Sequence, residues 1–283
     1  MKKLVVFIYP FEKIERIIDY AFRFAQPLNL EVEFVHTVEA GYINWDPTLN
    51  QYDTTNMVSP TTTGVIMEEL VEDRQRILRK ALSVKKASMN ISVPFTFSVL
   101  PGTHVFWSGE IAERNDIEMI LVPNSPDKLY DVTAPDLLEN SKHPVLAFPV
   151  EQDYHPIKTI IYATDFNDRE VEIIRNLSGI ANKLMASITV FHVSKNKEGY
   201  EEELKKAGLE EILSENISFK TIPVVQERSE KITEGIKEFC KKNNADLIVL
   251  MKENKNFFRE FFGRSTTREL LKDVDVPVLV YHQ

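Results

Sequence analysis

The chain has 283 residues, which suits one large domain or two ordinary ones, and 43% of them are apolar, enough for real cores. Its formal net charge of −9, with acids and bases interspersed, repels phosphate on average and argues against nucleic acid as a partner. The single cysteine, Cys240, excludes an intrachain disulfide, and no apolar stretch approaches the roughly 20 residues that span a bilayer. We therefore expect a cytoplasmic protein with no membrane partner.

The apolar run of residues 3–9 follows two lysines but ends at Tyr9-Pro10, and acidic residues come directly after it. It is too short for the hydrophobic part of a secretory signal, so it predicts a first buried strand. Apolar spacing along the rest of the first half predicts helix 12–25, strand 31–36, helix 65–88, strand 93–99, helix 107–115 and strands 119–122 and 144–148.

The second half repeats this order about 155 residues later. It predicts strand 158–164, helix 169–184, strand 187–192, helix 200–213, strand 217–222, helix 229–243 and strands 247–251 and 277–281. The alternation indicates βαβ units, and the nearly continuous apolar strands are typical of parallel sheets that helices cover on both faces.

These patterns predict an α/β fold with two tandem five-stranded parallel-sheet sandwiches, divided into domains at residues 1–150 and 156–283. The link between them, residues 151–156, is short and polar, so we expect the halves to pack together. The final strands of the two halves, 144–148 and 277–281, have edges that either join the halves or pair two molecules as a homodimer.

Three segments of the second half carry a family resemblance: Ala163-Thr-Asp-Phe166, Ala245-Asp-Leu-Ile-Val249 and Val276-Pro-Val-Leu-Val280. Residues 116–120 and 143–147 are weaker versions of the last two. The chain resembles the universal stress protein (UspA) family over nearly its whole length, as two copies of which the first is degenerate. The resemblance implies adenine nucleotide alpha hydrolase-like sandwiches packed as an internal pseudo-dimer. Many relatives bind ATP, and others do not.

The resemblance also implies a nucleotide pocket beyond the carboxyl ends of the second-half strands, where open parallel sheets bind ligands. In ATP-binding relatives an aspartate after the first strand contacts the nucleoside, and Asp165 holds that place. The loop after the second strand begins at His192-Val193. The positions of the family's phosphate-binding glycines are taken by Lys252, Lys255 and Ser265, and only Thr266 keeps the expected residue type.

Side chains at the glycine positions obstruct the close approach of backbone amides to phosphate. The candidate site therefore has the outline of a nucleotide pocket without its glycine contacts, and its residues are Asp165, Val193, Lys252, Lys255, Ser265 and Thr266. The cationic residues of the same loop, with hydroxyl groups at a helix N-terminus, suggest a site for another anionic small molecule. The alternative is a solvated basic loop in which Ser265 or Thr266 is an ordinary N-cap.

The first half has Tyr9-Pro10-Phe11 in place of the aspartate, and the loop after its fourth strand is shorter and lacks glycine. Nucleotide binding is therefore expected to be lost there. Residues 40–63 form an insertion, which we interpret as a lid, a partner-contact loop or a surface excursion. The phenylalanines at 257, 258, 261 and 262 suggest a pocket, an interface or a loop packed on its own core.

The sequence predicts neither a metal site nor a catalytic centre. The six histidines lack metal-ligand spacing, and no nucleophile elbow or phosphate-binding loop motif is present. Three functions remain open: a non-catalytic stress-response protein that binds a protein partner, an ATP- or AMP-binding switch with slow ATP hydrolysis, and, by fold analogy alone, a nucleotidyl transferase. The missing glycines favour the first function, and the place of Asp165 favours the second.

Overall fold

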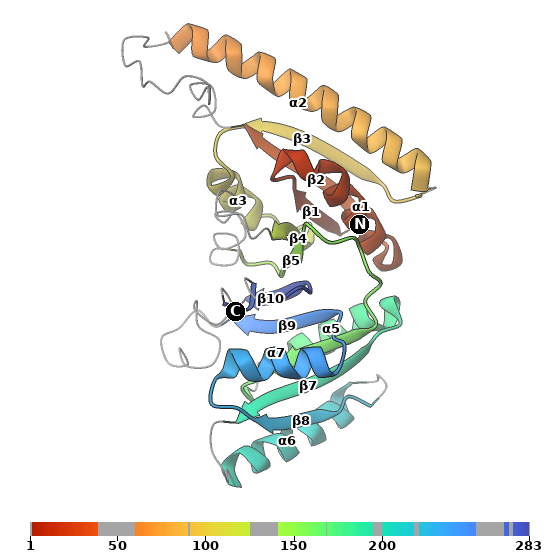
Figure 1. Ribbon diagram of the computed structural model, residues 1–283, viewed down its shortest axis with the longest axis vertical. Coiled ribbons are helices and arrows are strands. Elements are labelled where there is room, and N and C mark those ends of the chain that lie inside the picture. Colours follow the sequence, from red (N-terminus) through yellow and green to blue (C-terminus); the bar gives the residue numbers. More distant parts are fainter. Residues whose placement is uncertain are drawn as a thin grey trace.

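The computed structural model describes residues 2–38, 60–89, 91–124, 141–167, 169–194, 200–217, 221–252, 269–271 and 274–282. Strands and helices alternate along both halves of the chain (Figure 1). The elements of the first half are β1 (Lys3–Phe7), a 3-10 turn (Phe11–Lys13), α1 (Ile14–Leu28), β2 (Glu31–Val38), α2 (Pro60–Met89), β3 (Phe95–Pro101), α3 (His104–Ala112), β4 (Ile117–Asn124) and β5 (Val145–Pro149).

The second half repeats the series after a short connection. Its elements are β6 (Thr159–Ala163), α5 (Glu170–Leu184), β7 (Ser187–Ser194), α6 (Tyr200–Asn216), β8 (Val224–Arg228), α7 (Ile232–Lys242), β9 (Leu247–Lys252) and β10 (Val278–His282). The last four residues of the predicted insertion, 60–63, belong to the start of α2, and the rest of it lies outside the described residues.

One predicted strand is misplaced. Residues 217–222 were expected to form the third strand of the second half, but β8 begins at Val224. The reason is that Ile217 completes the preceding helix, since its backbone N–H donates to the carbonyl of Leu213 at 3.1 Å, and its apolar side chain is buried. The first contact with β7 among the described residues is made by Pro223, whose carbonyl accepts from the Val190 backbone N–H at 2.9 Å; residues 218–220 of the predicted strand lie outside the described residues.

The ten strands of the described residues form a single sheet in the order β3-β2-β1-β4-β5-β10-β9-β6-β7-β8. The five strands of each half are parallel to one another, as predicted. The halves meet where β5 pairs antiparallel with β10, and Leu279 stands opposite Leu146 in that register. The final strands therefore join the two halves of one molecule, and the fold is two tandem α/β sandwiches fused edge to edge.

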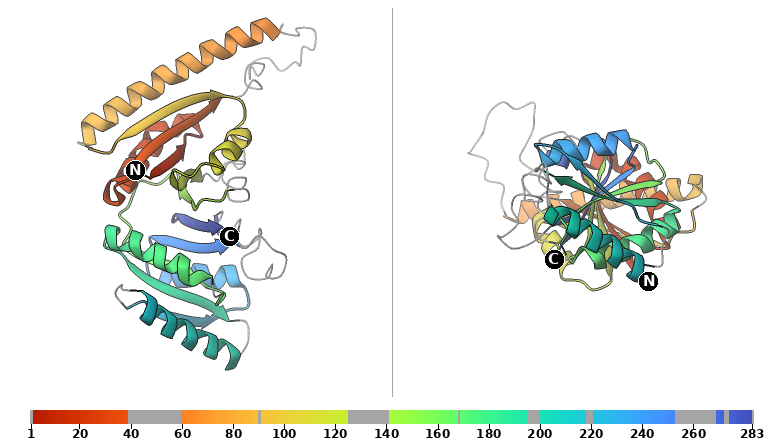
Figure 2. Two further views of the ribbon diagram at one scale, coloured as in Figure 1. Left: turned by 180° about the vertical axis from the view of Figure 1, so that it is seen from behind. Right: turned by 90° about the horizontal axis from the view of Figure 1, so that it is seen from below.

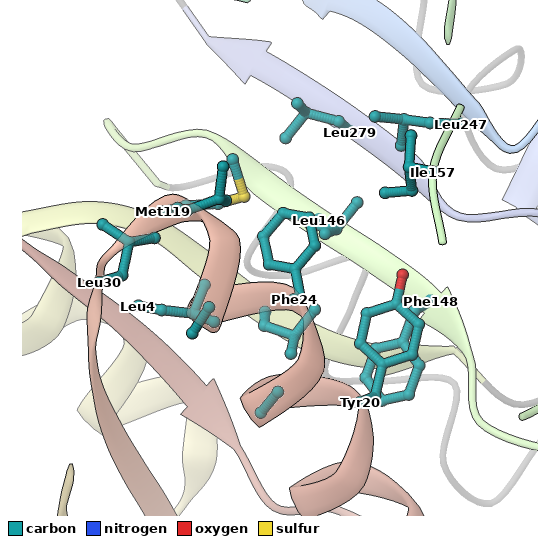
Figure 3. Packing of buried hydrophobic residues seen from close by; sticks show 14 of the residues in the cluster. Leu4, Tyr20, Phe24, Leu30, Met119, Leu146, Phe148, Ile157, Leu247 and Leu279 are labelled. Atoms are coloured by element: carbon teal, nitrogen blue, oxygen red, sulfur yellow. The ribbon is translucent and has the colours of Figure 1, made fainter. Parts of the chain in front are cut away.

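Helices cover both faces of this sheet (Figure 2). Residues of α1, α2, α5 and α6 pack in one buried cluster on one face, while α3 and α7 contribute to a second cluster on the other. The first cluster is continuous across the junction of the halves: Figure 3 shows Phe24 and Leu146 of the first half close to Ile157, Leu247 and Leu279 of the second. The two sandwiches thus share a core.

The connection between the halves is tied to α1. Lys13 pairs with Glu151 at 2.8 Å, and the guanidinium of Arg16 donates to the Glu151 carbonyl. The ring of Tyr154 contacts Tyr20 edge-on, with centroids 5.2 Å apart. These contacts fix the path of the chain from β5 to β6. Among the described helices, none combines the length and apolar character needed to cross a lipid bilayer.

Candidate functional site

The candidate site begins where β6 ends, at Thr164-Asp165-Phe166. The Thr164 backbone N–H donates to the carbonyl of Phe191, which prolongs the pairing with β7 by one residue. The chain then turns sharply: Phe166 has a φ of 64° in the left-handed region, and its N–H donates to the Thr164 hydroxyl at 2.8 Å. This turn holds Asp165 at the carboxyl end of the strand, half-buried, which is the place predicted for it.

A fully buried carboxyl group lies beneath the turn. Glu170, at the start of α5, is 0% exposed and accepts hydrogen bonds from the Thr164 hydroxyl and, at 3.4 Å, from the Asp165 backbone N–H. Burial raises the pKa of Glu170 well above its usual value, and the nearby charge of Asp165 raises it further. The protonated form of Glu170 is therefore favoured in the folded protein.

The end of β7 supplies the second wall of the site. The Nδ1 atom of His192 lies 2.8 Å from the Thr164 carbonyl oxygen, and its ring packs on Phe166 with centroids 4.3 Å apart. Burial lowers the pKa of His192, so the neutral ring is favoured. Neutral imidazole with Nδ1 protonated donates to the carbonyl and ties the ends of β6 and β7 together.

The side chain of Val193 lies on the opposite face of the sheet from that of His192. Successive side chains of a strand lie on opposite faces, and the Val193 side chain belongs to the buried cluster beneath α7. Both of its methyl carbons would lie 3.0 Å from a Cβ atom at Gly235, so only glycine allows α7 to approach β7 this closely. Val193 was predicted as a site residue, and only its backbone can therefore contact a ligand.

A second carboxylate enters the site from α6. Glu202 Oε2 accepts from the Ser194 hydroxyl at 2.5 Å and from the Gln226 amide at 3.0 Å, and its Oε1 lies 4.0 Å from His192 Nε2. Glu202 precedes the buried Leu209 by two helical turns and therefore shares its face of α6.

The predicted loop residues are placed only in part. Lys252 is the last residue of β9, opposite His282 of β10, and its side chain is half-buried. Lys255, Ser265 and Thr266 lie outside the described residues, as do the phenylalanines at 257, 258, 261 and 262. The described structure therefore brings together Asp165, Glu170, His192 and Glu202.

The first half repeats the histidine but not the buried carboxyl group. His36 Nδ1 lies 2.8 Å from the Ile8 carbonyl oxygen, and the His36 ring packs on Phe11 with centroids 4.4 Å apart. Burial lowers the pKa of His36 to about 4. The guanidinium of Arg74 lies over Phe11 at 4.5 Å. The shared histidine contact is thus a feature of the duplicated fold. Near His36 the described residues include an exposed carboxylate, Glu12, but no buried one that corresponds to Glu170.

The chemistry of the described site is acidic and polar. Two partly exposed carboxylates, those of Asp165 and Glu202, lie around the ends of β6 and β7, and their negative charge disfavours a phosphate at this position. Within the part of the chain that the structure describes, no cluster of three or more histidine, cysteine or acidic side chains has a geometry that could hold a metal ion. The arrangement fits the binding and orientation of a ligand's polar groups.

A duplicated α/β sandwich with a polar site at the carboxyl ends of its strands defines the class of this protein as a tandem α/β protein. The sequence model of the universal stress protein family matches residues 156–282. The second half of the chain therefore contains a universal stress protein domain, and the first half repeats its order of strands and helices. No curated protein sequence matches it.

Several solved structures match nearly the whole chain. A universal stress protein from Archaeoglobus fulgidus DSM 4304 is 14% identical with a TM-score of 0.68, and the match covers 99% of this chain and 96% of that one. A functionally unknown protein from Pseudomonas aeruginosa PAO1 is 15% identical with a TM-score of 0.57, over 100% and 92% of the two chains. At these identities the matches establish the tandem fold alone.

Proposed function

We propose that this protein is a non-catalytic binding protein of the universal stress protein family that acts through a protein partner, and that its second half, residues 156–283, has a degenerate nucleotide pocket. The observation that carries the proposal is the acidic strand end. Glu170 is buried directly behind Asp165, and Glu202 faces His192 beside it.

The sequence of the adjoining loop supports the same proposal. Backbone amides bind phosphate best where glycine lets them approach closely, and Lys252, Lys255 and Ser265 stand at the family's glycine positions. A triphosphate would lose those amide contacts and would meet carboxylates at the ends of β6 and β7. Both effects weaken ATP binding.

A second candidate function is an ATP- or AMP-binding switch with slow hydrolysis. The position of Asp165 directly after β6 supports it, because a carboxylate there would accept hydrogen bonds from a ribose or a base. The basic residues of the loop, including Lys252, would then replace the missing glycines as partners of an anionic group. In this case the pocket would work through side chains.

Calorimetric titration distinguishes the two functions. We expect no heat of binding with ATP or AMP up to about 1 mM, a limit that corresponds to roughly 4 kcal/mol of binding free energy. The matched variant Lys252→Gly/Lys255→Gly/Ser265→Gly restores the glycine pattern, and we expect it to bind ATP measurably if the outline of the pocket is intact.

Micromolar binding of ATP or AMP by the natural chain would contradict the proposal and establish the switch. An additional Asp165→Asn substitution in a nucleotide-binding form would then show whether this carboxylate contacts the nucleoside. Native mass spectrometry of the purified chain checks the same point independently, since a copurified nucleotide adds a defined mass.

A further inference from the structure

The ten-stranded sheet ends in two unequal edges. Its outermost strands are β3 and β8, and within the described residues no strand pairs with the outer side of either. β3 has the sequence FTFSVLP, seven residues without a charged side chain. Charged residues are a common protection of an exposed edge against pairing with another chain, and β3 has none.

The helix beside β3 presents positive charge at this edge. Arg79 lies over the Phe97 ring of β3 at 5.7 Å and Lys86 over the Phe95 ring at 5.2 Å, whereas Lys85 on another side of the helix pairs with Asp19 of α1. From Arg74 onward, α2 contains six basic residues and no acidic one.

A shallow groove of about 360 Å³ runs along this part of α2. Its lining residues are Glu72, Gln75, Arg76, Arg79, Lys80 and Ser83. The Arg76 side chain is 81% exposed and pairs with the neighbouring Asp73. The groove can therefore accept carboxylates from a second surface.

The opposite end of the molecule carries the complementary charge. α6 lies beside β8 and contains six glutamates and two lysines (Figure 1). Both α2 and α6 bury two leucines one turn apart, Leu78 and Leu82 in one, Leu209 and Leu213 in the other. When the sequences of the two helices are aligned on these buried leucines, Arg79 and Lys80 correspond to Glu210 and Glu211. Equivalent positions of the two helices therefore have opposite charge.

We propose that a second copy of this chain binds head to tail, with the β3 edge and α2 of one copy against the β8 edge and α6 of the next. The helices α2 and α6 lie on the same face of the sheet, and the strands of the two halves run in opposite directions. A second copy can continue the sheet beyond β8 with its α2 and α6 on the same side as those of the first copy. Its β3 then runs antiparallel to β8 of the first copy, and its α2 lies beside α6 of the first copy.

This arrangement repeats the internal junction, where β5 and β10 are antiparallel and α1 contacts α5. The contact is heterologous, since each copy uses a different surface at each end. Such contacts do not close into a dimer but extend into a chain of copies. The exposed apolar residues of α6, Tyr200 and Leu204, add contact area at the same surface.

Sedimentation velocity over a range of protein concentrations tests the proposal. We expect species larger than a dimer that grow with concentration, and association at least about tenfold weaker in 500 mM than in 50 mM salt, because exposed charges are screened. The variants Arg76→Glu/Lys80→Glu and Glu210→Lys/Glu211→Lys should each remain monomeric, since each makes the facing helices alike in charge.

A one-to-one mixture of the two variants should associate again, because each then meets the opposite charge on the other. The control Lys142→Glu/Lys241→Glu changes exposed charges away from both edges and should associate like the natural chain. Circular dichroism verifies that every variant is folded. A natural chain that stays monomeric, or a closed dimer that none of the charge reversals affects, would overturn the proposal.

Discussion

Glu170 shows how a single buried group links the fold to pH. Its carboxyl is surrounded by the turn of residues 164–166 and has no exposed surface. A group whose pKa is raised on folding stabilises the folded state fully below its unfolded pKa of about 4.5, and that contribution is lost as pH rises through the folded value. The candidate site is thus held most firmly in mild acid.

The variant Glu170→Gln tests this sign. Glutamine keeps the size and an oxygen acceptor for the Asp165 N–H, and it cannot ionise. We expect the melting temperature of the variant, relative to that of the natural chain, to rise as the pH is raised above the unfolded pKa of about 4.5, because the natural carboxyl is then driven to ionise.

Glu172→Gln is the matched control, because Glu172 lies on the same helix with an exposed side chain. Its melting temperature should stay parallel to that of the natural chain over the same pH range. If the difference in melting temperature between Glu170→Gln and the natural chain were also independent of pH, the buried carboxyl would not be the cause of the pH-dependent stability.

At the scale of elements, α1 and α5 occupy equivalent places and end in the same way. Both are followed by a residue in the left-handed conformation, Asn29 with φ 56° and Met185 with φ 55°. Each of these residues donates its backbone N–H to carbonyls of the last helical turn. Asparagine adopts this conformation readily, but the Cβ of methionine makes it costly.

We therefore expect Met185→Gly to raise the free energy of unfolding by about 1 kcal/mol, because glycine removes the strain at this φ. The Met185 side chain is 75% exposed, so little packing is lost. The shift in the urea midpoint at constant slope measures the effect. Asn29→Gly is the control, with a smaller expected gain, and an equal gain at both positions would contradict the strain at Met185.

The elements were the most predictable part of this molecule. Alternating apolar runs located every strand and helix of both halves to within a few residues, apart from β8, because local periodicity reflects which face is buried. The site was predictable only where a family motif marks it, as at Asp165. Glu170 and Glu202 were not found, since the burial of a carboxyl depends on contacts between distant segments, which apolar spacing does not report.

At the scale of the whole molecule, the junction of β5 and β10 makes two sandwiches into one structure. Leu146 and Leu279 face each other in register and are both buried in the cluster that spans the halves. A core shared in this way couples the unfolding of the two halves. Chemical denaturation of the natural chain should therefore follow a single transition by fluorescence and by circular dichroism.

Truncation at the junction tests the coupling. Leu279→Ala leaves a cavity between the halves, and we expect it to lower the free energy of unfolding by about 2–5 kcal/mol. Val65→Ala is the control, because Val65 is 51% exposed near the start of α2 and its loss should cost less than about 0.5 kcal/mol. Two separate transitions in the natural chain, or equal effects of the two variants, would show that the halves are independent.

The antiparallel pair at the junction also has a consequence for biosynthesis. β5 leaves the ribosome well before β10, and at the usual rate of translation the interval is on the order of ten seconds. During that time the newly made first sandwich has an apolar edge strand, VLAFP, whose future partner has not yet been synthesised. Nascent chains on neighbouring ribosomes would compete for it, so the central strand that unites the finished protein is the one that needs shielding by a chaperone while the protein is being made.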